Sequence, residues 1–166
     1  FNGIGMNVIC YDMYPDTKSG LNYVTLDEIF EKSDLISLHI PLTEESKHII
    51  NKESIAKMKD GVMLVNTSRG GLIDTKALIE AIEHNKFRGV ALDVYEEEGD
   101  YFFEDKSDEI IQDDGLIKLM SFPNVLVTSH QAFFTEESMQ AISKVTLDNL
   151  KAFEKGEKSG NEVEAK

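Results

Sequence analysis

The chain has 166 residues, a length that suits one well-buried domain and is too short for two full-sized ones. Apolar residues make up 41% and charged residues 29%, as in a folded globular protein rather than a disordered chain. The formal net charge of −14 argues against nucleic acid as a partner, and no apolar run approaches the about 20 residues of a membrane span. The single cysteine, Cys10, excludes an internal disulfide and favours a reducing, cytoplasmic setting.

Short apolar runs rich in β-forming residues predict five strands. Their apolarity is continuous rather than alternating, which is typical of strands buried on both faces of a parallel sheet. The runs are Met6–Tyr11, Leu35–Ile40, Val62–Val65, Val90–Leu92 and Val125–Val127.

Segments with helical patterning lie between and after these runs. This alternation of strands and helices predicts a doubly wound parallel α/β sheet of the Rossmann type, with helices on both faces. The last helix is expected to carry apolar residues such as Met139, Ile142 and Phe153 inward. The predicted helices are Leu26–Lys32, Glu53–Lys59, one capped by Asp74, Asp113–Met120, and a long one after Thr135.

Much of the excess negative charge lies in one segment, Glu96–Asp114, which holds ten carboxylates and one lysine. We expect these charges to form a solvated face, while the aromatic residues Tyr101, Phe102 and Phe103 pack inward. The polar tail from Glu154 to Lys166 has no periodicity and is expected to be an exposed end.

Polar residues follow every predicted strand. Open parallel sheets bind ligands beyond the carboxyl ends of their strands, so we expect these residues to form one site. In chain order the residues at the strand ends, polar except for Ile40 and Pro41, are Asp12, then His39, Ile40 and Pro41, then Asn66, Thr67, Ser68 and Arg69, then Asp93 with Glu96, Glu97 and Glu98, and finally Ser129 and His130.

Two of these positions have a functional and a purely structural interpretation. Asp12 either accepts the hydroxyl groups of an adenosine ribose or is an ordinary turn residue. Arg69 either binds a carboxylate with its guanidinium fork or caps a loop. The flanking residues Ser68, Gly70 and Gly71 would let the backbone approach a ligand closely.

Among the four histidines, His130 is the candidate general acid–base because it lies in a loop at the expected site. Glu98 is its candidate partner, and Glu96 and Glu97 are equally possible from sequence alone. The other histidines have structural interpretations: His39 packs at a strand end, while His48 and His84 lie on the surface. The chain contains no G-x-S-x-G motif and no paired histidines at ligand spacing, so neither a serine triad nor a metal site is predicted.

Four ordered motifs resemble the D-2-hydroxyacid dehydrogenase family, and the similarity covers nearly the whole chain. The acidic segment and the sequence HQAF resemble in particular the fermentative D-lactate dehydrogenases of bacteria. The motifs are HIPLTEESKHIIN (His39–Asn51), VNTSRGGLID (Val65–Asp74), ALDVYEEE (Ala91–Glu98) and NVLVTSHQAFFT (Asn124–Thr135).

The resemblance implies an NADH-dependent reduction of pyruvate to D-lactate, and its reverse. By this resemblance, Arg69 would bind the substrate carboxylate, His130 would move the proton of the carbonyl oxygen, and Glu98 would hold His130. It also implies a set of NAD contacts: Asp12 on the adenosine ribose, Ile40 and Pro41 on the adenine side, Thr67, Ser68 and Arg69 beside the nicotinamide half, and Asp93 at the carboxamide.

The sequence departs from the family pattern in two ways. Ser129 stands where many members have proline before the histidine. The glycine-rich fingerprint G-x-G-x-x-G, its strand and a separate substrate domain are missing. We therefore expect residues 1–134 to be a partial NAD-binding domain, and residues 135–166 to be a helix and tail that return to the missing domain.

The missing strand has two expected consequences. Met6–Tyr11 and Val62–Val65 lose the strand that should lie between them, so their backbone groups need another partner. The cofactor's pyrophosphate loses its helix N-terminus, so this chain alone is expected to bind NADH weakly and to turn nothing over.

Other functions are open at this point. One is a dehydrogenase of a bulkier 2-oxo acid, such as 2-oxoisocaproate or phenylpyruvate. Another is an NAD-sensing interaction module similar to the C-terminal-binding-protein corepressors, and a third is a truncated, inactive product. The resemblance further implies a homo-oligomer, a dimer or tetramer, whose substrate is a small 2-oxo or 2-hydroxy acid.

Overall fold

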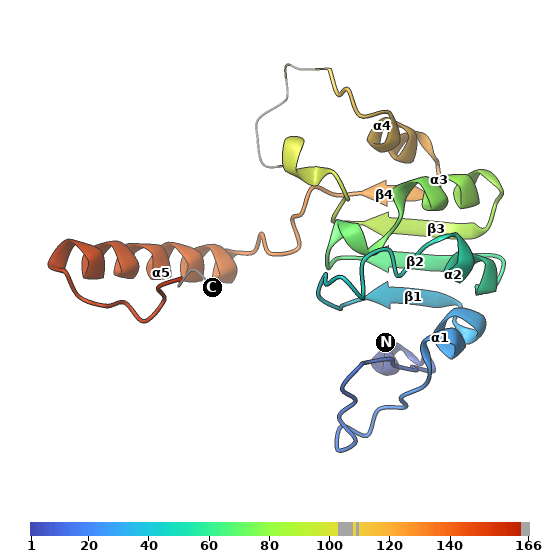
Figure 1. Ribbon diagram of the computed structural model, residues 1–166, viewed down its shortest axis with the longest axis horizontal. Helices are drawn as coiled ribbons and strands as arrows, with labels where there is room; N and C mark the ends of the chain where they lie inside the picture. The colour runs from blue at the N-terminus through green and yellow to red at the C-terminus, as the bar shows by residue number, and fades with distance from the viewer. Residues whose placement is uncertain (103–107, 109, 164–166) are drawn as a thin grey trace. The chain divides into compact units, whose positions relative to one another are not determined.

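The computed structural model describes residues 1–102, 108 and 110–163. Residues 1–130 contain a parallel four-stranded sheet in the order β1-β2-β3-β4 (Figure 1). Four of the five predicted strands are confirmed, although β1 ends earlier and β3 begins earlier than predicted. The strands are β1 (Leu35–Leu38), β2 (Val62–Asn66), β3 (Phe87–Leu92) and β4 (Val125–Val127).

Short helices precede each strand of the sheet, and a side chain accepts a backbone N–H at the start of each helix. These N-caps, Thr25, Asn51, Asp74 and Asp113, satisfy amide groups that a helix start leaves without a partner. The helices, all predicted from sequence, are α1 (Leu26–Lys32), α2 (Lys52–Lys57), α3 (Thr75–Glu83) and α4 (Asp114–Ser121). Single turns of 3-10 helix, η1, η2 and η3, form at Asn2–Ile4, Gly70–Leu72 and Glu98–Asp100.

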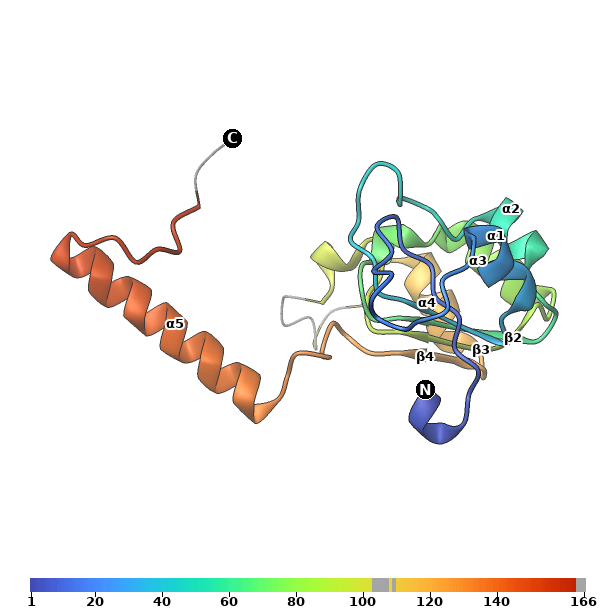
Figure 2. The same ribbon diagram turned by 90° about the horizontal axis from the view of Figure 1, so that it is seen from below.

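These four helices lie on one face of the sheet (Figure 2). Each strand pairs with the next strand in the chain, and α1 contacts α2, α2 contacts α3, and α3 contacts α4. A sheet is covered on both faces when its strand order reverses, because the reversal sends later helices to the opposite face. The parallel, Rossmann-like α/β class is confirmed. The described helices cover one face rather than the expected two, since the strand order does not reverse.

The first predicted strand, Met6–Tyr11, does not form in the described structure. Cys10 makes one isolated parallel bridge to Tyr23. Its N–H donates to the Asn22 carbonyl at 2.8 Å, and its carbonyl accepts the Val24 N–H at 2.9 Å. The prediction of a strand here is wrong because an apolar run extends into a ladder only beside a neighbouring strand.

Strand β2 was expected to lose its neighbour, and it pairs directly with β1 instead. Leu35 lies opposite Met63 and Leu38 opposite Asn66 in a parallel register. This pairing gives β2 its backbone partners, so the expectation that this strand lacks a neighbour is wrong for the described sheet. The sheet is therefore continuous from β1 to β4.

The core lies between the sheet and its helices. Ile36, Leu64 and Val90 occupy one register row across three strands, and each is at most 4% exposed. Burying an aliphatic side chain of this size contributes about 1.5–3 kcal/mol. Tyr101 and Phe102 of the acidic segment pack against this core, as expected, whereas Phe103 lies outside the described residues.

Residues Gln131–Lys166 form a compact unit separate from Phe1–His130. In it, α5 (Glu136–Lys155) begins at the N-cap Thr135 and ends at Gly156, which has a left-handed conformation. The expectation that the apolar side of α5 points inward is wrong for the described residues. None of its residues is buried, because an amphipathic helix covers its apolar side only against a packed partner.

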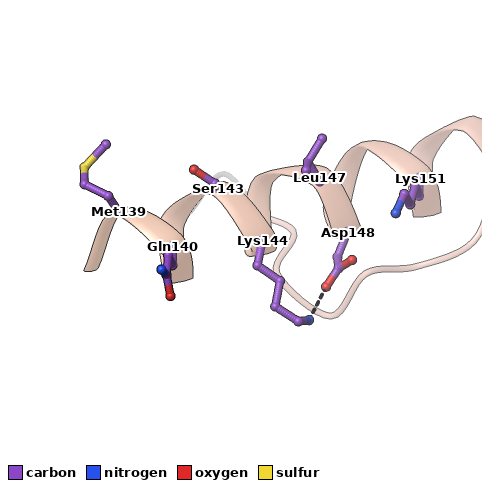
Figure 3. A pocket seen from close by; sticks show the side chains of 7 residues that line it. All are labelled: Met139, Gln140, Ser143, Lys144, Leu147, Asp148 and Lys151. Atoms are coloured by element: carbon purple, nitrogen blue, oxygen red, sulfur yellow. Dashed lines mark hydrogen bonds and ion pairs between the residues drawn. The ribbon is translucent and has the colours of Figure 1, made fainter. Parts of the chain in front are cut away.

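A shallow hollow runs along α5 (Figure 3). Its lining includes an ion pair between Lys144 Nζ and Asp148 at 2.6 Å, and it contains none of the predicted site residues. Among the described helices, none is both long enough and apolar enough to cross a membrane.

Candidate active site

Hydrogen bonds continue beyond the ends of the strands and join four loops at the carboxyl edge of the sheet. The Asp93 N–H donates to the Asn66 carbonyl at 2.9 Å, and the His130 N–H donates to the Asp93 carbonyl at 2.6 Å. The Ser68 hydroxyl donates to the Ile40 carbonyl at 2.6 Å. The loops after β1, β2, β3 and β4 are therefore held together where open parallel sheets bind ligands.

His130 follows β4, and its imidazole lies against Glu98. The distance between His130 Nδ1 and Glu98 Oε1 is 2.9 Å, and the two side chains are 28% and 16% exposed. Glu98 Oε2 accepts the Tyr95 N–H at 3.0 Å, so both carboxylate oxygens are engaged. Of the three glutamates left open by the sequence, the structure brings Glu98 to His130.

The backbone of His130 is unusual. Its φ of 54° lies in the left-handed region, which residues with a Cβ adopt uncommonly and which is enriched at functional sites. His130 takes this conformation in the loop that follows β4, where its ring is within reach of Glu98.

Asp93 is a buried carboxylate in the same cluster. It is 6% exposed, and its Oδ1 accepts a hydrogen bond from the Thr128 hydroxyl. A carboxylate at this depth requires such partners to offset the loss of solvation. Its backbone also bonds to both Asn66 and His130, so Asp93 fixes the spacing between the loops after β2 and β4.

Arg69 lies on a tight turn after β2, and its side chain is exposed. Its Nη1 donates to the Ser68 carbonyl at 2.7 Å. The fully buried Asn66 shapes the turn, because its side chain donates to the Arg69 carbonyl (2.9 Å) and accepts the Ser68 N–H (3.0 Å). The sequence places Asn66 at the end of a predicted strand and gives it no role, because an amide side chain there has no further signal.

Gly70, the next residue, allows a close approach of two backbones. A Cβ at this position would lie 2.1 Å from the carbonyl carbon of Tyr95 and 2.5 Å from the nitrogen of Glu96. The sequence suggested that this glycine lets a ligand approach the backbone closely. In the structure, its lack of a side chain lets the loop after β3 pack against it.

The predicted cofactor residues divide into two groups. Ile40, Pro41, Thr67 and Ser68 lie at the carboxyl edge, with Pro41 and Thr67 exposed and Ser68 bonded to Ile40. Asp12 belongs to the N-terminal segment, where its exposed Oδ1 accepts the Tyr14 N–H at 2.8 Å in a turn. The structure thus brings four of these residues together with Asp93 at one edge, and it gives Asp12 a turn contact.

The remaining histidines differ in their surroundings. His48, expected on the surface, is half-buried, and its Nε2 lies 2.6 Å from Glu96 Oε1. No sequence signal connects the two, because they are 48 residues apart. His84 is exposed as expected, and His39 is exposed rather than packed, with its Nε2 2.8 Å from the Ser37 hydroxyl. Among the described residues, no three His, Cys, Asp or Glu side chains gather as metal ligands.

Comparison with known proteins gives consistent matches. Residues 1–132 match the family model described as "D-isomer specific 2-hydroxyacid dehydrogenase, NAD binding domain". The chain is 49% identical over 164 residues to the D-lactate dehydrogenase of Escherichia coli K12, covering 97% of this chain and 50% of that protein. It is 47% identical over 157 residues to an aromatic 2-oxoacid reductase of Clostridium sporogenes, covering 93% and 47%. The crystal structure of a D-lactate dehydrogenase from Treponema pallidum is similar with a TM-score of 0.89 and 40% identity, covering 99% of this chain and 50% of that one.

The chain therefore belongs to the D-isomer specific 2-hydroxyacid dehydrogenase family, and its residues 1–132 match the NAD-binding domain of that family. The resemblance found in the motifs is confirmed, and so is NAD as the cofactor of this domain. The chain spans about half the length of the relatives it matches.

Proposed function

We propose that this chain supplies the NAD-binding domain and the acid–base histidine of a longer dehydrogenase that reduces pyruvate to D-lactate and catalyses the reverse reaction. The observation that carries the proposal is the His130–Glu98 pair, held at the same sheet edge as the exposed Arg69. A 2-oxo acid presents a carboxylate and a carbonyl oxygen, which are the groups that an arginine fork and an imidazolium recognise.

The chemistry of the chain's own residues fits part of NAD. The exposed carboxylate of Asp12 suits the hydroxyl groups of the adenosine ribose and would repel the 2′-phosphate of NADP. Ile40 and Pro41 would line the adenine side, Thr67 and Ser68 would border the nicotinamide half beside Arg69, and Asp93 would meet the carboxamide. The sequence contains no G-x-G-x-x-G motif, so the pyrophosphate contacts would come from residues outside this chain.

Arg69, His130 and Glu98 would each have a separate role in the reaction. NADH, when bound, supplies the hydride that adds to C2 of the 2-oxo acid. Arg69 binds the carboxylate through paired N–H groups and orients the carbonyl. His130 gives its Nε2 proton to the carbonyl oxygen, since Nδ1 faces Glu98, and it takes the proton back when a 2-hydroxy acid is oxidised. Glu98 fixes the orientation of the ring and stabilises the imidazolium.

A second candidate is a dehydrogenase of a bulkier 2-oxo acid. The 47% identity to an aromatic 2-oxoacid reductase supports it, because that level is close to the 49% identity to a D-lactate dehydrogenase. In either case the substrate is a small 2-oxo or 2-hydroxy acid. We also propose that the whole protein is a homo-oligomer located in the cytoplasm.

The test uses the completed protein, meaning this chain joined to an N-terminal portion that carries the glycine-rich loop. NADH oxidation is followed with pyruvate, 2-oxoisocaproate and phenylpyruvate, and the product is resolved by chiral chromatography. A highest kcat/KM with pyruvate and a D-lactate product support the proposal. A preference for phenylpyruvate supports the second candidate, whereas NADH binding without turnover of any 2-oxo acid contradicts both and favours an NAD-sensing module.

A further inference from the structure

A second histidine–glutamate pair lies near the proposed site and takes no part in the mechanism above. His48 Nε2 lies 2.6 Å from Glu96 Oε1, and their side chains are 35% and 23% exposed. Glu96 and Glu98 belong to the same short loop after β3. One stretch of backbone therefore carries two carboxylates, each paired with a different histidine.

Glu96 is held at both of its carboxylate oxygens. While Oε1 faces His48, Oε2 accepts the Thr75 hydroxyl at 3.0 Å and the Thr75 N–H at 3.4 Å. Thr75 is the first residue of α3, and a carboxylate is stabilised near the N-terminus of a helix. Glu96 therefore fixes the loop after β3 both to α3 and to the loop that carries His48.

His48 is itself fixed through its backbone. Its φ is 52°, its N–H donates to the Gly71 carbonyl at 2.9 Å, and its carbonyl accepts the Asn51 side-chain amide at 2.9 Å. Gly71 belongs to the turn that carries Arg69. His48 therefore bonds to the turn of Arg69 through its backbone and to the loop of Glu98 through its ring.

The turn and the loop also meet directly at Gly70, which lies against the backbone of Tyr95 and Glu96. Tyr95 in turn donates its N–H to Glu98. A displacement of Glu96 would therefore change both the surface on which Gly70 rests and the position of the carboxylate that holds His130.

We propose that His48 and Glu96 are positioning residues, whose pair sets the spacing between Arg69 and the Glu98–His130 pair. This inference rests on the proposed function. Arg69 must hold the substrate carbonyl within reach of His130, and a misplacement on the order of 1 Å lowers the rate about 100-fold. Loss of the pair therefore reduces kcat and leaves cofactor binding unchanged.

The experiment compares two variants of the completed protein. His48→Phe keeps an aromatic ring and removes the donor, whereas His48→Gln keeps an N–H that reaches Glu96. We expect kcat to fall about 10- to 100-fold in His48→Phe, with KM for NADH within about twofold of the wild type. His48→Gln recovers most of kcat. The matched control is His84→Phe at an exposed histidine, which leaves kcat unchanged.

Two further measurements separate a loss of fold from a loss of positioning. Thermal unfolding shows whether His48→Phe has lost its fold. If it has, Glu96→Gln is measured in place of His48→Phe, because glutamine keeps the size of the Glu96 side chain and an acceptor for Thr75. The NMR signals of the His130 ring, which need no turnover, are expected to shift in His48→Phe and not in His84→Phe.

A wild type that reduces no 2-oxo acid contradicts the proposed function, and the His130 signals then decide the positioning role alone. An active wild type whose kcat is unaffected by His48→Phe overturns the positioning role. Equal losses in His48→Phe and His48→Gln, or His130 signals that do not move, overturn it as well.

Discussion

Gly70 and Tyr95 pack backbone against backbone, so closely that a Cβ on residue 70 would lie 2.1 Å from the carbonyl carbon and oxygen of Tyr95. This contact places the turn of Arg69 against the loop of Glu98, which holds His130. This backbone contact acts beside the His48–Glu96 pair in holding the proposed substrate-binding arginine close to the proposed acid–base pair.

Gly70→Ala is expected to lower the free energy of unfolding by about 1–3 kcal/mol, because the added methyl group overlaps backbone that cannot rotate away. Urea unfolding of the completed protein measures the change. Gly89→Ala is the matched control, since its Cβ would lie no closer than 3.7 Å to the nearest atom, the Met63 methyl carbon. Equal stabilities for the two variants would contradict the packing described here.

Tyr95→Phe tests the link between the site loop and α4. The Tyr95 hydroxyl donates to Asp113 Oδ2 at 2.8 Å, and Asp113 Oδ1 caps α4 by accepting the Leu116 N–H. Removing the hydroxyl is expected to cost about 1 kcal/mol of unfolding free energy, since a buried hydrogen bond is lost. Tyr14→Phe, at a tyrosine 85% exposed, should leave the stability unchanged.

The same tyrosine predicts a loss of stability at alkaline pH. Burial, followed by the hydrogen bond and charge of Asp113, raises the pKa of Tyr95 well above its ordinary value. The folded protein therefore keeps the proton while the unfolded chain releases it near pH 10, so stability is full below about pH 10 and falls above it. Unfolding measured across this range should show a smaller alkaline loss in Tyr95→Phe than in the wild type.

Arg69→Gln removes the guanidinium fork proposed to bind the substrate carboxylate. We expect a loss of about 2–4 kcal/mol of transition-state stabilisation, or roughly 30- to 1,000-fold in kcat/KM for the 2-oxo acid. The comparison is with Arg88→Gln, at an exposed arginine on β3. Similar kinetics in both variants would exclude Arg69 as the carboxylate-binding residue.

The isolated 166-residue chain is expected to bind NADH weakly, because it contains no glycine-rich loop to hold the pyrophosphate. Titration calorimetry of this chain and of the completed protein compares the two affinities directly. Tight, stoichiometric binding by the isolated chain would show that the pyrophosphate needs no such loop.

Local chemistry made most of the fold predictable. Asp74 was identifiable as an N-cap because its carboxylate stands directly before an apolar-periodic segment, whereas Asp113, predicted as the first residue of its helix, is the N-cap in the structure. Met6–Tyr11 has strand composition and forms no strand, since a ladder depends on a neighbour that the run itself cannot reveal.

The candidate site was predictable in its residue types and not in its pairings. Strand ends indicated where His130 and Glu96–Glu98 would meet, yet only the folded loop shows that Glu98 faces His130 and Glu96 faces His48. Asn66 was placed at a strand end without a role, because it satisfies the backbone of a turn and no sequence pattern marks that role.

The proposed proton transfer by His130 is tested by the kcat of His130→Gln with pyruvate and NADH in the completed protein. We expect a fall of about 100- to 10,000-fold with an unchanged dissociation constant for NADH, because only proton transfer is lost. His84→Gln, at an exposed histidine, serves as the matched control. A His130→Gln variant that turns over pyruvate at the wild-type rate would show that His130 is not the acid–base residue.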